Sequence, residues 1–152
     1  MIPYAIQIAY PGINNEKEFQ NTLIELKKMG YSGIELNIED FCAPPPGRLK
    51  TYLDDSGLIL YAVATGKYAK AHCLSLTSPK KEIRLKSIDA CRNMIEYAHN
   101  FNANIILGYI KGTPYDAGEN AEPYIAEGLC ALKENAGFLH MPKYRINNAG
   151  RH

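Results

Sequence analysis

Polar side chains interrupt two short apolar segments in the N-terminal part of the chain. Gln7 lies between two isoleucines, and Glu35 and Asn37 alternate with isoleucine and leucine. A carboxylate buried in such a strand without a partner costs several kcal/mol. Glu35 is therefore the strongest candidate for binding a substrate, and Gln7 and Asn37 are candidates for further contacts to it. Two alternatives stay open: Glu35 forms a structural ion pair with Lys111 or Lys67, and Gln7 is a satisfied core amide.

Three further candidates for substrate binding lie downstream. Tyr109 and Lys111 come at the end of a later apolar segment, where the ammonium of Lys111 could hold a phosphate or carboxylate as a point charge. His72 lies in a long connection and could contact a substrate or a metal. The alternatives are a solvated lysine and an ordinary loop histidine. The sequence assigns no residue as catalytic and none as a metal ligand.

Two nucleotide-binding motifs are excluded. Thr65-Gly66-Lys67 has the ending of a phosphate-binding loop, but Tyr61 stands at the required first glycine and Tyr68 at the required Ser or Thr. No G-x-G-x-x-G follows the first apolar segment, so a dinucleotide site is unsupported.

Composition places the chain among ordinary folded domains. It has 152 residues, 46% of them hydrophobic, and a formal net charge of +1. This balance excludes a disordered or collagen-like chain and gives no general attraction to nucleic acid or to an anionic membrane. No apolar stretch is long enough to cross a bilayer, and the first residues do not resemble a secretory signal. We therefore expect neither nucleic acid nor membrane as a partner.

The cysteine pattern indicates the compartment. The four cysteines are separated by 31, 18 and 39 residues and include no CxxC pair. This spacing favours reduced thiols in a cytoplasmic protein. We interpret Cys91 and Cys130 as small core residues on helices.

Hydrophobic periodicity predicts which elements position the candidate residues. Alternating or continuous apolar runs predict four strands, and 3.6-residue stripes with capping residues predict four helices. The strands are expected at 4–10, 33–38, 58–64 and 105–110. The first helix is expected to follow Asn14 or Asn15 and to end before Gly30, and the second is expected around 49–53. The third is expected to begin at Ser78-Pro79 and to reach the αL residue Asn102, and the fourth is expected to span 122–134. Residues 65–77 are expected to form a long connection.

The order β-α-β-α-β-α-β-α predicts an α/β fold with parallel strands. In a closed parallel barrel, one face of each strand packs against helices and the other fills the lumen. The isoleucine-rich faces suit the helices, whereas the faces with Gln7, Glu35 and Asn37 suit the lumen. These residues lie in the second halves of their strands, towards the end where such folds place their chemistry.

Three segments together resemble the sugar phosphate isomerase/epimerase superfamily, the xylose isomerase-like TIM barrels that also include endonuclease IV-type nucleases. The resemblance covers about residues 4–136. Its second-strand motif is G-[YF]-x-[GA]-[IV]-E-[LI]. The matching segments are Gly30-Tyr31-Ser32-Gly33-Ile34-Glu35-Leu36, then Ser75-Leu76-Thr77-Ser78-Pro79 followed by Arg84, then Ile106-Leu107-Gly108-Tyr109-Ile110-Lys111-Gly112. An Arg often replaces Lys111 in that family.

The resemblance implies an activity that this chain does not supply in full. Intact relatives bind a divalent metal (Mn, Mg, Co or Zn) through Glu, Asp, His and Glu of strands five to eight. Two of these acidic residues move a proton next to a carbonyl of a sugar or keto-sugar while the metal polarises the carbonyl. The part of the chain that resembles the family ends before the position of strand five. His72 and Cys73 have no companion on the second strand, which speaks against an endonuclease IV-type zinc site.

Length and charge suggest a boundary near residue 137. A TIM barrel takes ~250 residues, so residues 1–137 would form the first four βα units of an incomplete barrel. Residues 133–152 carry a net charge of +3, so the preceding 132 residues sum to −2. The predicted tail, 138–152, is basic and irregular. We favour a truncated or frameshifted isomerase/epimerase-like protein with little isomerase activity and weak metal affinity. The alternatives are a non-catalytic half-barrel that pairs with itself or a partner through its open edge, and a small open α/β binding protein.

Overall fold

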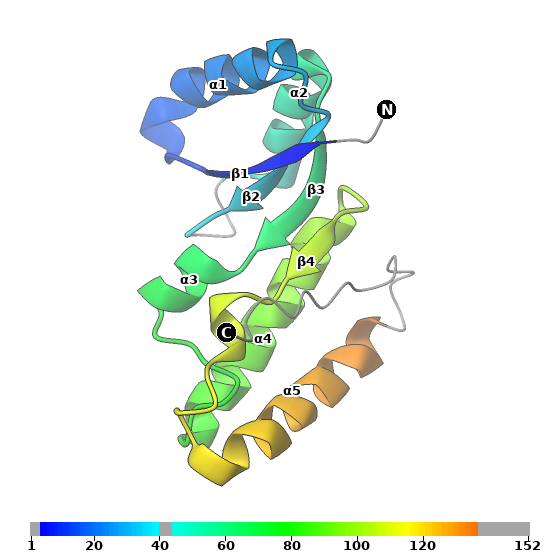
Figure 1. Ribbon diagram of the computed structural model, residues 1–152. Helices are drawn as coiled ribbons and strands as arrows, with labels where there is room; N and C mark the ends of the chain where they lie inside the picture. Colours follow the sequence, from blue (N-terminus) through cyan, green and yellow to red (C-terminus); the bar gives the residue numbers. More distant parts are fainter. Residues whose placement is uncertain (1–3, 40–43, 137–152) are drawn as a thin grey trace.

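The computed structural model describes residues 4–39 and 44–136 and has the predicted α/β class (Figure 1). Four parallel strands alternate with helices along the chain. The strands are β1 (Ala5–Ala9), β2 (Gly33–Asn37), β3 (Ile59–Ala64) and β4 (Asn104–Ile106). The helices are α1 (Glu16–Lys28), α2 (Pro46–Ser56), α3 (Gly66–Ala71), α4 (Lys81–His99) and α5 (Ala121–Ala136), with short 3-10 helices η1 (Ile13–Asn15), η2 (Tyr109–Lys111) and η3 (Gly118–Asn120).

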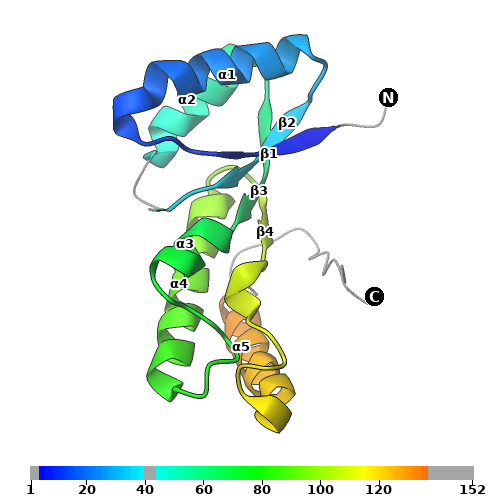
Figure 2. The same cartoon turned by 60° about the vertical axis from the view of Figure 1, so that its left-hand side comes forward.

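The strands lie in the sheet in chain order, β1-β2-β3-β4, and the prediction of parallel pairing is confirmed. Figures 1 and 2 show α1 and α2 together at the β1 end of the sheet, and α4 and α5 together at the β4 end. None of the helices in the described part is long and apolar enough to cross a membrane. The predicted basic tail, 138–152, lies outside the described residues.

One face of the sheet packs against the helices to form the core. Ile34, Leu36 and Val63 are fully buried on this face, as the alternating pattern predicts. Helices contribute fully buried apolar side chains as well. These include Leu23 of α1, Leu49 of α2 and Met94 of α4. Burial of each such side chain contributes roughly 1.5–3 kcal/mol to stability, so this layer holds the strands in register.

A bulge in β3 shapes the opposite face. The pairing of β2 with β3 shifts between Ile34 and Glu35, so that Ile34 faces Leu60 while Glu35 faces Ala62. Tyr61 is the extra residue, and its ring lies against Gly33. A Cβ atom at Gly33 would meet the carbonyl oxygen of Ile59 and lie 2.6 Å from Cδ2 of Tyr61. Position 33 therefore requires glycine because the neighbouring strand approaches too closely for any side chain.

The structure differs from the sequence-based expectations at three elements. The connection 65–77 contains the helix α3, which was not predicted. The fourth strand ends at Ile106 instead of residue 110, and η2 follows it. The longest helix has Lys80 as its N-cap, whereas Ser78 was expected there; the Oγ atom of Ser78 accepts a hydrogen bond from the Lys80 N–H at 3.3 Å.

Candidate functional site

Gln7 and Glu35 are paired positions of β1 and β2, and they alternate with Ile6 and Ile34, which belong to the core or pack against it, so they lie on the opposite face of the sheet. Gln7 is exposed and Glu35 is half-buried. No described residue forms a hydrogen bond or an ion pair with either side chain. The alternative that Glu35 pairs with Lys111 or Lys67 is therefore not observed within residues 4–39 and 44–136, and the same holds for a satisfied amide at Gln7. Within the described part of the chain, both side chains are therefore without a protein partner.

Asn37 has a structural contact that the sequence did not reveal. Its Oδ1 atom accepts a hydrogen bond from the Lys67 N–H at 2.9 Å. Lys67 is the second residue of α3, so the amide of Asn37 satisfies one of the free N–H groups at the start of that helix. Thr65, the N-cap residue, makes no such side-chain bond. The end of β2 thus fixes the position of α3.

Thr65 joins the ends of β3 and β4. Its N–H donates to the carbonyl of Ile106 at 3.2 Å, and its Oγ1 accepts from the Gly108 N–H at 3.2 Å. The side chain is completely buried. Because Gly108 also donates to the Ile106 carbonyl at 2.9 Å, the chain turns away from the sheet here. This turn directs Tyr109 and Lys111 towards the loop that follows α3.

A cleft of about 590 Å³ lies beyond the carboxyl end of β4, between η2 and the segment that runs from the end of α3 towards α4. Two predicted site residues, Tyr109 and Lys111, line it. Gln7, Glu35 and Asn37 do not, so the structure separates the candidates into a polar sheet face and a cleft. The cleft is lined by Lys70, Cys73, Leu74, Ser75, Ser78, Pro79, Gly108, Tyr109, Lys111, Gly112, Thr113 and Asp116.

His72 belongs to neither group. It is exposed, and its ring lies 4.3 Å from that of Tyr68, with the planes tilted by 36°. It is not among the residues that line the cleft. The described residues therefore give His72 a packing contact on α3 and place no other candidate beside it.

Asp116 organises one wall of the cleft and was missed by sequence reasoning. Its Oδ2 accepts hydrogen bonds from Ser75 Oγ at 3.1 Å, Thr77 Oγ1 at 2.9 Å and the Thr113 N–H at 2.9 Å. Its Oδ1 accepts from Thr113 Oγ1 at 2.8 Å. The bonds from Thr113, then the one from Thr77, hold the pKa of the Asp116 carboxyl below its usual value. A Cβ at Gly112, where φ is +76°, would enter this cluster.

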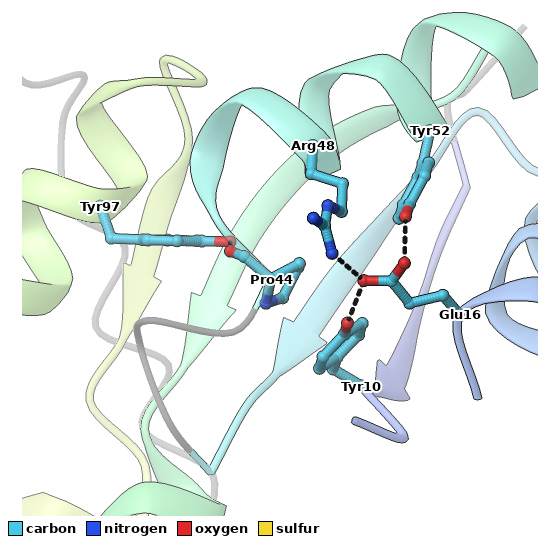
Figure 3. A network of polar contacts seen from close by, with 6 residues as sticks. All are labelled: Tyr10, Glu16, Pro44, Arg48, Tyr52 and Tyr97. Atoms are coloured by element: carbon cyan, nitrogen blue, oxygen red, sulfur yellow. Dashed lines mark hydrogen bonds and ion pairs between the residues drawn. The ribbon is translucent and has the colours of Figure 1, made fainter. Parts of the chain in front are cut away.

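A second carboxylate, Glu16, holds three elements together outside the cleft (Figure 3). Its Oε1 accepts from Arg48 at 2.6 Å and from the Tyr10 hydroxyl at 3.2 Å, and its Oε2 accepts from the Tyr52 hydroxyl at 2.8 Å. The Arg48 guanidinium, followed by the Tyr52 hydroxyl, lowers the pKa of Glu16. Burial, together with the Glu16 bond, raises the pKa of Tyr10 to about 12.

This network joins the end of β1 to the first residue of α1 and to α2. Every oxygen of its carboxylate already has a donor, so we interpret it as structural. Figure 3 also shows the hydroxyl of Tyr97, which donates at 2.9 Å to the carbonyl of Pro44 and ties α4 to the segment before α2.

The described residues do not fit a divalent metal. No group of three or more His, Cys, Asp or Glu side chains within residues 4–39 and 44–136 could hold one. Glu35 is the one carboxylate on the paired polar positions of β1 and β2, and the Asp116 oxygens are occupied by hydroxyl and N–H donors.

No family model matches the sequence of this chain, and no curated protein matches it.

Proposed function

We propose that this α/β unit is the first half of a xylose isomerase-like barrel and binds a sugar or keto-sugar at the carboxyl ends of its strands. The observation that carries the proposal is the pairing of Gln7 with Glu35 on the sheet face opposite Ile34 and Leu36, with no described protein partner for either side chain. An amide beside a carboxylate offers both donors and acceptors to neighbouring hydroxyl groups.

The residues on that face support a barrel-like role. Most side chains on the same face of the sheet as Gln7 and Glu35 are small or polar, although Ile106 and the ring of Tyr61 also lie there. The small or polar ones include Ala5 and Ala9 of β1, Gly33 of β2, Ala62 and Ala64 of β3 and Asn104 of β4. Small side chains leave room near the sheet for a ligand, whereas the opposite face carries branched apolar residues that pack on helices.

The proposed role of these residues is binding and orientation. The Glu35 carboxylate accepts hydrogen bonds from ligand hydroxyls, and the Gln7 amide can bond a hydroxyl or a carbonyl oxygen. Intact relatives use a divalent metal to polarise the sugar carbonyl. The described residues of this chain offer one unpaired carboxylate on the face, so we propose ligand binding for this unit and no proton transfer.

Calorimetric titration tests this proposal. The chain is titrated with D-ribulose and D-xylulose, and the same titrations are made with Glu35→Gln and Gln7→Leu. Because hydrogen bonds to a charged group contribute about 1.5–3 kcal/mol, Glu35→Gln should weaken binding about tenfold or more. Glu96→Gln is the matched control, since Glu96 is exposed on α4 and its side chain has no described partner. Equal affinities of Glu35→Gln and the unsubstituted chain would contradict the proposal.

A second candidate function is a half-barrel module that binds a second copy of itself. The observation that favours it is the exposure of β1, where Ala5, Gln7 and Ala9 are all exposed and the strand pairs only with β2 among the described residues. An open strand edge can pair with another chain. Sedimentation should then give a sharp dimer that unfolds cooperatively, whereas a monomer or polydisperse aggregate would contradict this candidate.

A further inference from the structure

The ring of Tyr61 lies on the same face of the sheet as Glu35. Gly33 and Glu35 are two residues apart on β2, so a side chain at position 33 would point to the face that carries Glu35. A Cβ atom there would lie 2.6 Å from Cδ2 and 2.8 Å from Cε2 of Tyr61. The ring of Tyr61 therefore fills the space above Gly33 that a side chain would otherwise occupy.

The bulge in β3 brings this ring close to Glu35. The register shift between Ile34 and Glu35 leaves Tyr61 without a paired position on β2. A bulge re-aims the side chain of its extra residue, and here the ring leans over the neighbouring strand, above Gly33. With a rise of about 3.3 Å per residue, Gly33 and Glu35 are about 7 Å apart along β2. This spacing is close to the width of one monosaccharide ring, so a sugar that contacts Glu35 can also contact the ring of Tyr61.

Much of the Tyr61 side chain is not used by the rest of the described protein. Tyr61 is half-buried, yet it is not among the half-buried apolar side chains that pack against the core. No aromatic ring within residues 4–39 and 44–136 stacks on it, and its hydroxyl has no hydrogen-bond partner there. The residue that pairs with Gly33 on β1 is Ala5, whose side chain is small. A partly exposed surface of aromatic carbon therefore lies beside the amide of Gln7 and the carboxylate of Glu35.

We propose that the ring of Tyr61 is the apolar contact of the sugar-binding site and selects a ligand in its closed-ring form. The inference deepens the proposed function and rests on it for the contacts of Gln7 and Glu35. A closed sugar ring with equatorial hydroxyls directs its C–H groups to its two faces. One such face packs on aromatic carbon while hydroxyls at the rim reach the carboxylate and the amide. An open-chain sugar has no such face, and more of its bonds must be ordered on binding.

Calorimetric titration with methyl β-D-xylopyranoside and with xylitol tests the inference. The pyranoside is locked in a closed ring, whereas xylitol has the same hydroxyl configuration and cannot form one. We expect the pyranoside to bind about threefold to tenfold more tightly, because of the added aromatic contact. Tyr61→Leu should lose this preference, and Tyr61→Phe, which retains the ring, should keep it. Tyr115→Leu is the matched control, because Tyr115 is 94% exposed in the loop between η2 and η3, and it should also keep the preference.

Equal binding of the two probes to the unsubstituted chain would overturn the inference, whether or not Tyr61→Leu folds. A preference that survives in folded Tyr61→Leu would overturn it too, and so would a preference lost in Tyr61→Phe, which would assign the contact to the hydroxyl. In each of these cases the proposed function stands if Glu35→Gln still weakens sugar binding. If Tyr61→Leu loses the preference while Glu35→Gln binds as the unsubstituted chain does, the ring contact stands and the proposed function fails.

Discussion

The Oδ1 atom of Asn37 accepts a hydrogen bond of 2.9 Å from the backbone N–H of Lys67, and so the last residue of β2 caps the start of α3. The cap comes from a residue 30 positions earlier in the chain. It places α3, and with it Lys70, at the edge of the cleft. The position of one cleft lysine therefore depends on a strand residue that does not itself line the cleft.

Replacing Asn37 by Ala should destabilise the chain by about 1 kcal/mol, because a capping acceptor is lost. Urea unfolding followed by circular dichroism measures this loss. Asn93→Ala is the control, because Asn93 is exposed on α4 and its side chain has no described partner. Equal stability of the two variants would refute the capping role.

Gly33→Ala should cost roughly 1–3 kcal/mol, as overpacking of a close contact does. The added Cβ would meet the carbonyl of Ile59, which is backbone and cannot rotate away, as well as the ring of Tyr61. Gly47→Ala is the matched control, because a Cβ there meets nothing within 4 Å and the position is helical. The control should gain about 0.5–1 kcal/mol from helix propensity. Denaturant midpoints that move in the same direction for both variants would contradict this account.

The Glu16 network should make stability depend on acidic pH. The pKa of Glu16 lies below its ordinary value of 4.5 in the folded chain, first through Arg48 and then through Tyr52. The Glu16 carboxyl therefore binds a proton more readily in the unfolded chain than in the folded chain. The contribution of its network to the free energy of unfolding is fully present above pH 4.5 and is lost as the pH falls through the pKa of Glu16 in the folded chain. Unfolding free energies measured between pH 7 and pH 3 should fall less steeply in Glu16→Gln.

Glu18→Gln provides the comparison for that titration. Glu18 lies in the same first turn of α1, but its side chain has no described hydrogen-bond or ion-pair partner. It should retain the steeper pH dependence of the unsubstituted chain. Parallel curves for Glu16→Gln and the unsubstituted chain would show that the network does not couple folding to protonation.

The cysteines should differ in their reactivity towards a thiol reagent. Cys91 is fully buried in α4, and burial raises the pKa of its thiol to about 12. It should react only at the rate of unfolding, because the thiolate is the reactive form. Cys73 and Cys130 are exposed and should react at once. Mass spectrometry of peptides after timed labelling measures this, and rapid modification of Cys91 in the native protein would contradict the packing of α4.

Patterns local in sequence predicted most of the fold. Alternation located the apolar face of β2, where Ile34 and Leu36 are fully buried. The residues expected to end two helices in a left-handed conformation were also predicted correctly: Gly30 has φ of +93° just after α1, and Asn102 has φ of +52° after α4. Cys130 was predicted to be buried and is exposed, so that prediction was wrong. Cys130 comes directly after Leu129, which is half-buried on α5, and the rotation of about 100° per residue in a helix turns Cys130 towards solvent.

Features that depend on contacts distant in sequence were not predictable. The helix α3 has no side-chain cap from its own N-cap residue and depends on Asn37 instead. The fourth strand ends early because Thr65, on a different segment, binds the turn at Gly108. The Asp116 cluster joins residues 41 positions apart, Ser75 and Asp116, which carry no shared motif. The sequence therefore predicted Tyr109 and Lys111 as site residues but not the cleft that they line.

The most direct test of the central claim is a two-dimensional ¹H–¹⁵N NMR titration of the labelled chain with D-ribulose. We predict saturable shifts in the side-chain amide of Gln7 and the backbone amides of Glu35 and Asn37, together with those of residues 108–113. These atoms lie at the carboxyl ends of the strands and around the cleft. Shifts confined to the outer helices, or no shifts at millimolar ligand, would contradict the claim that this end of the sheet binds a sugar.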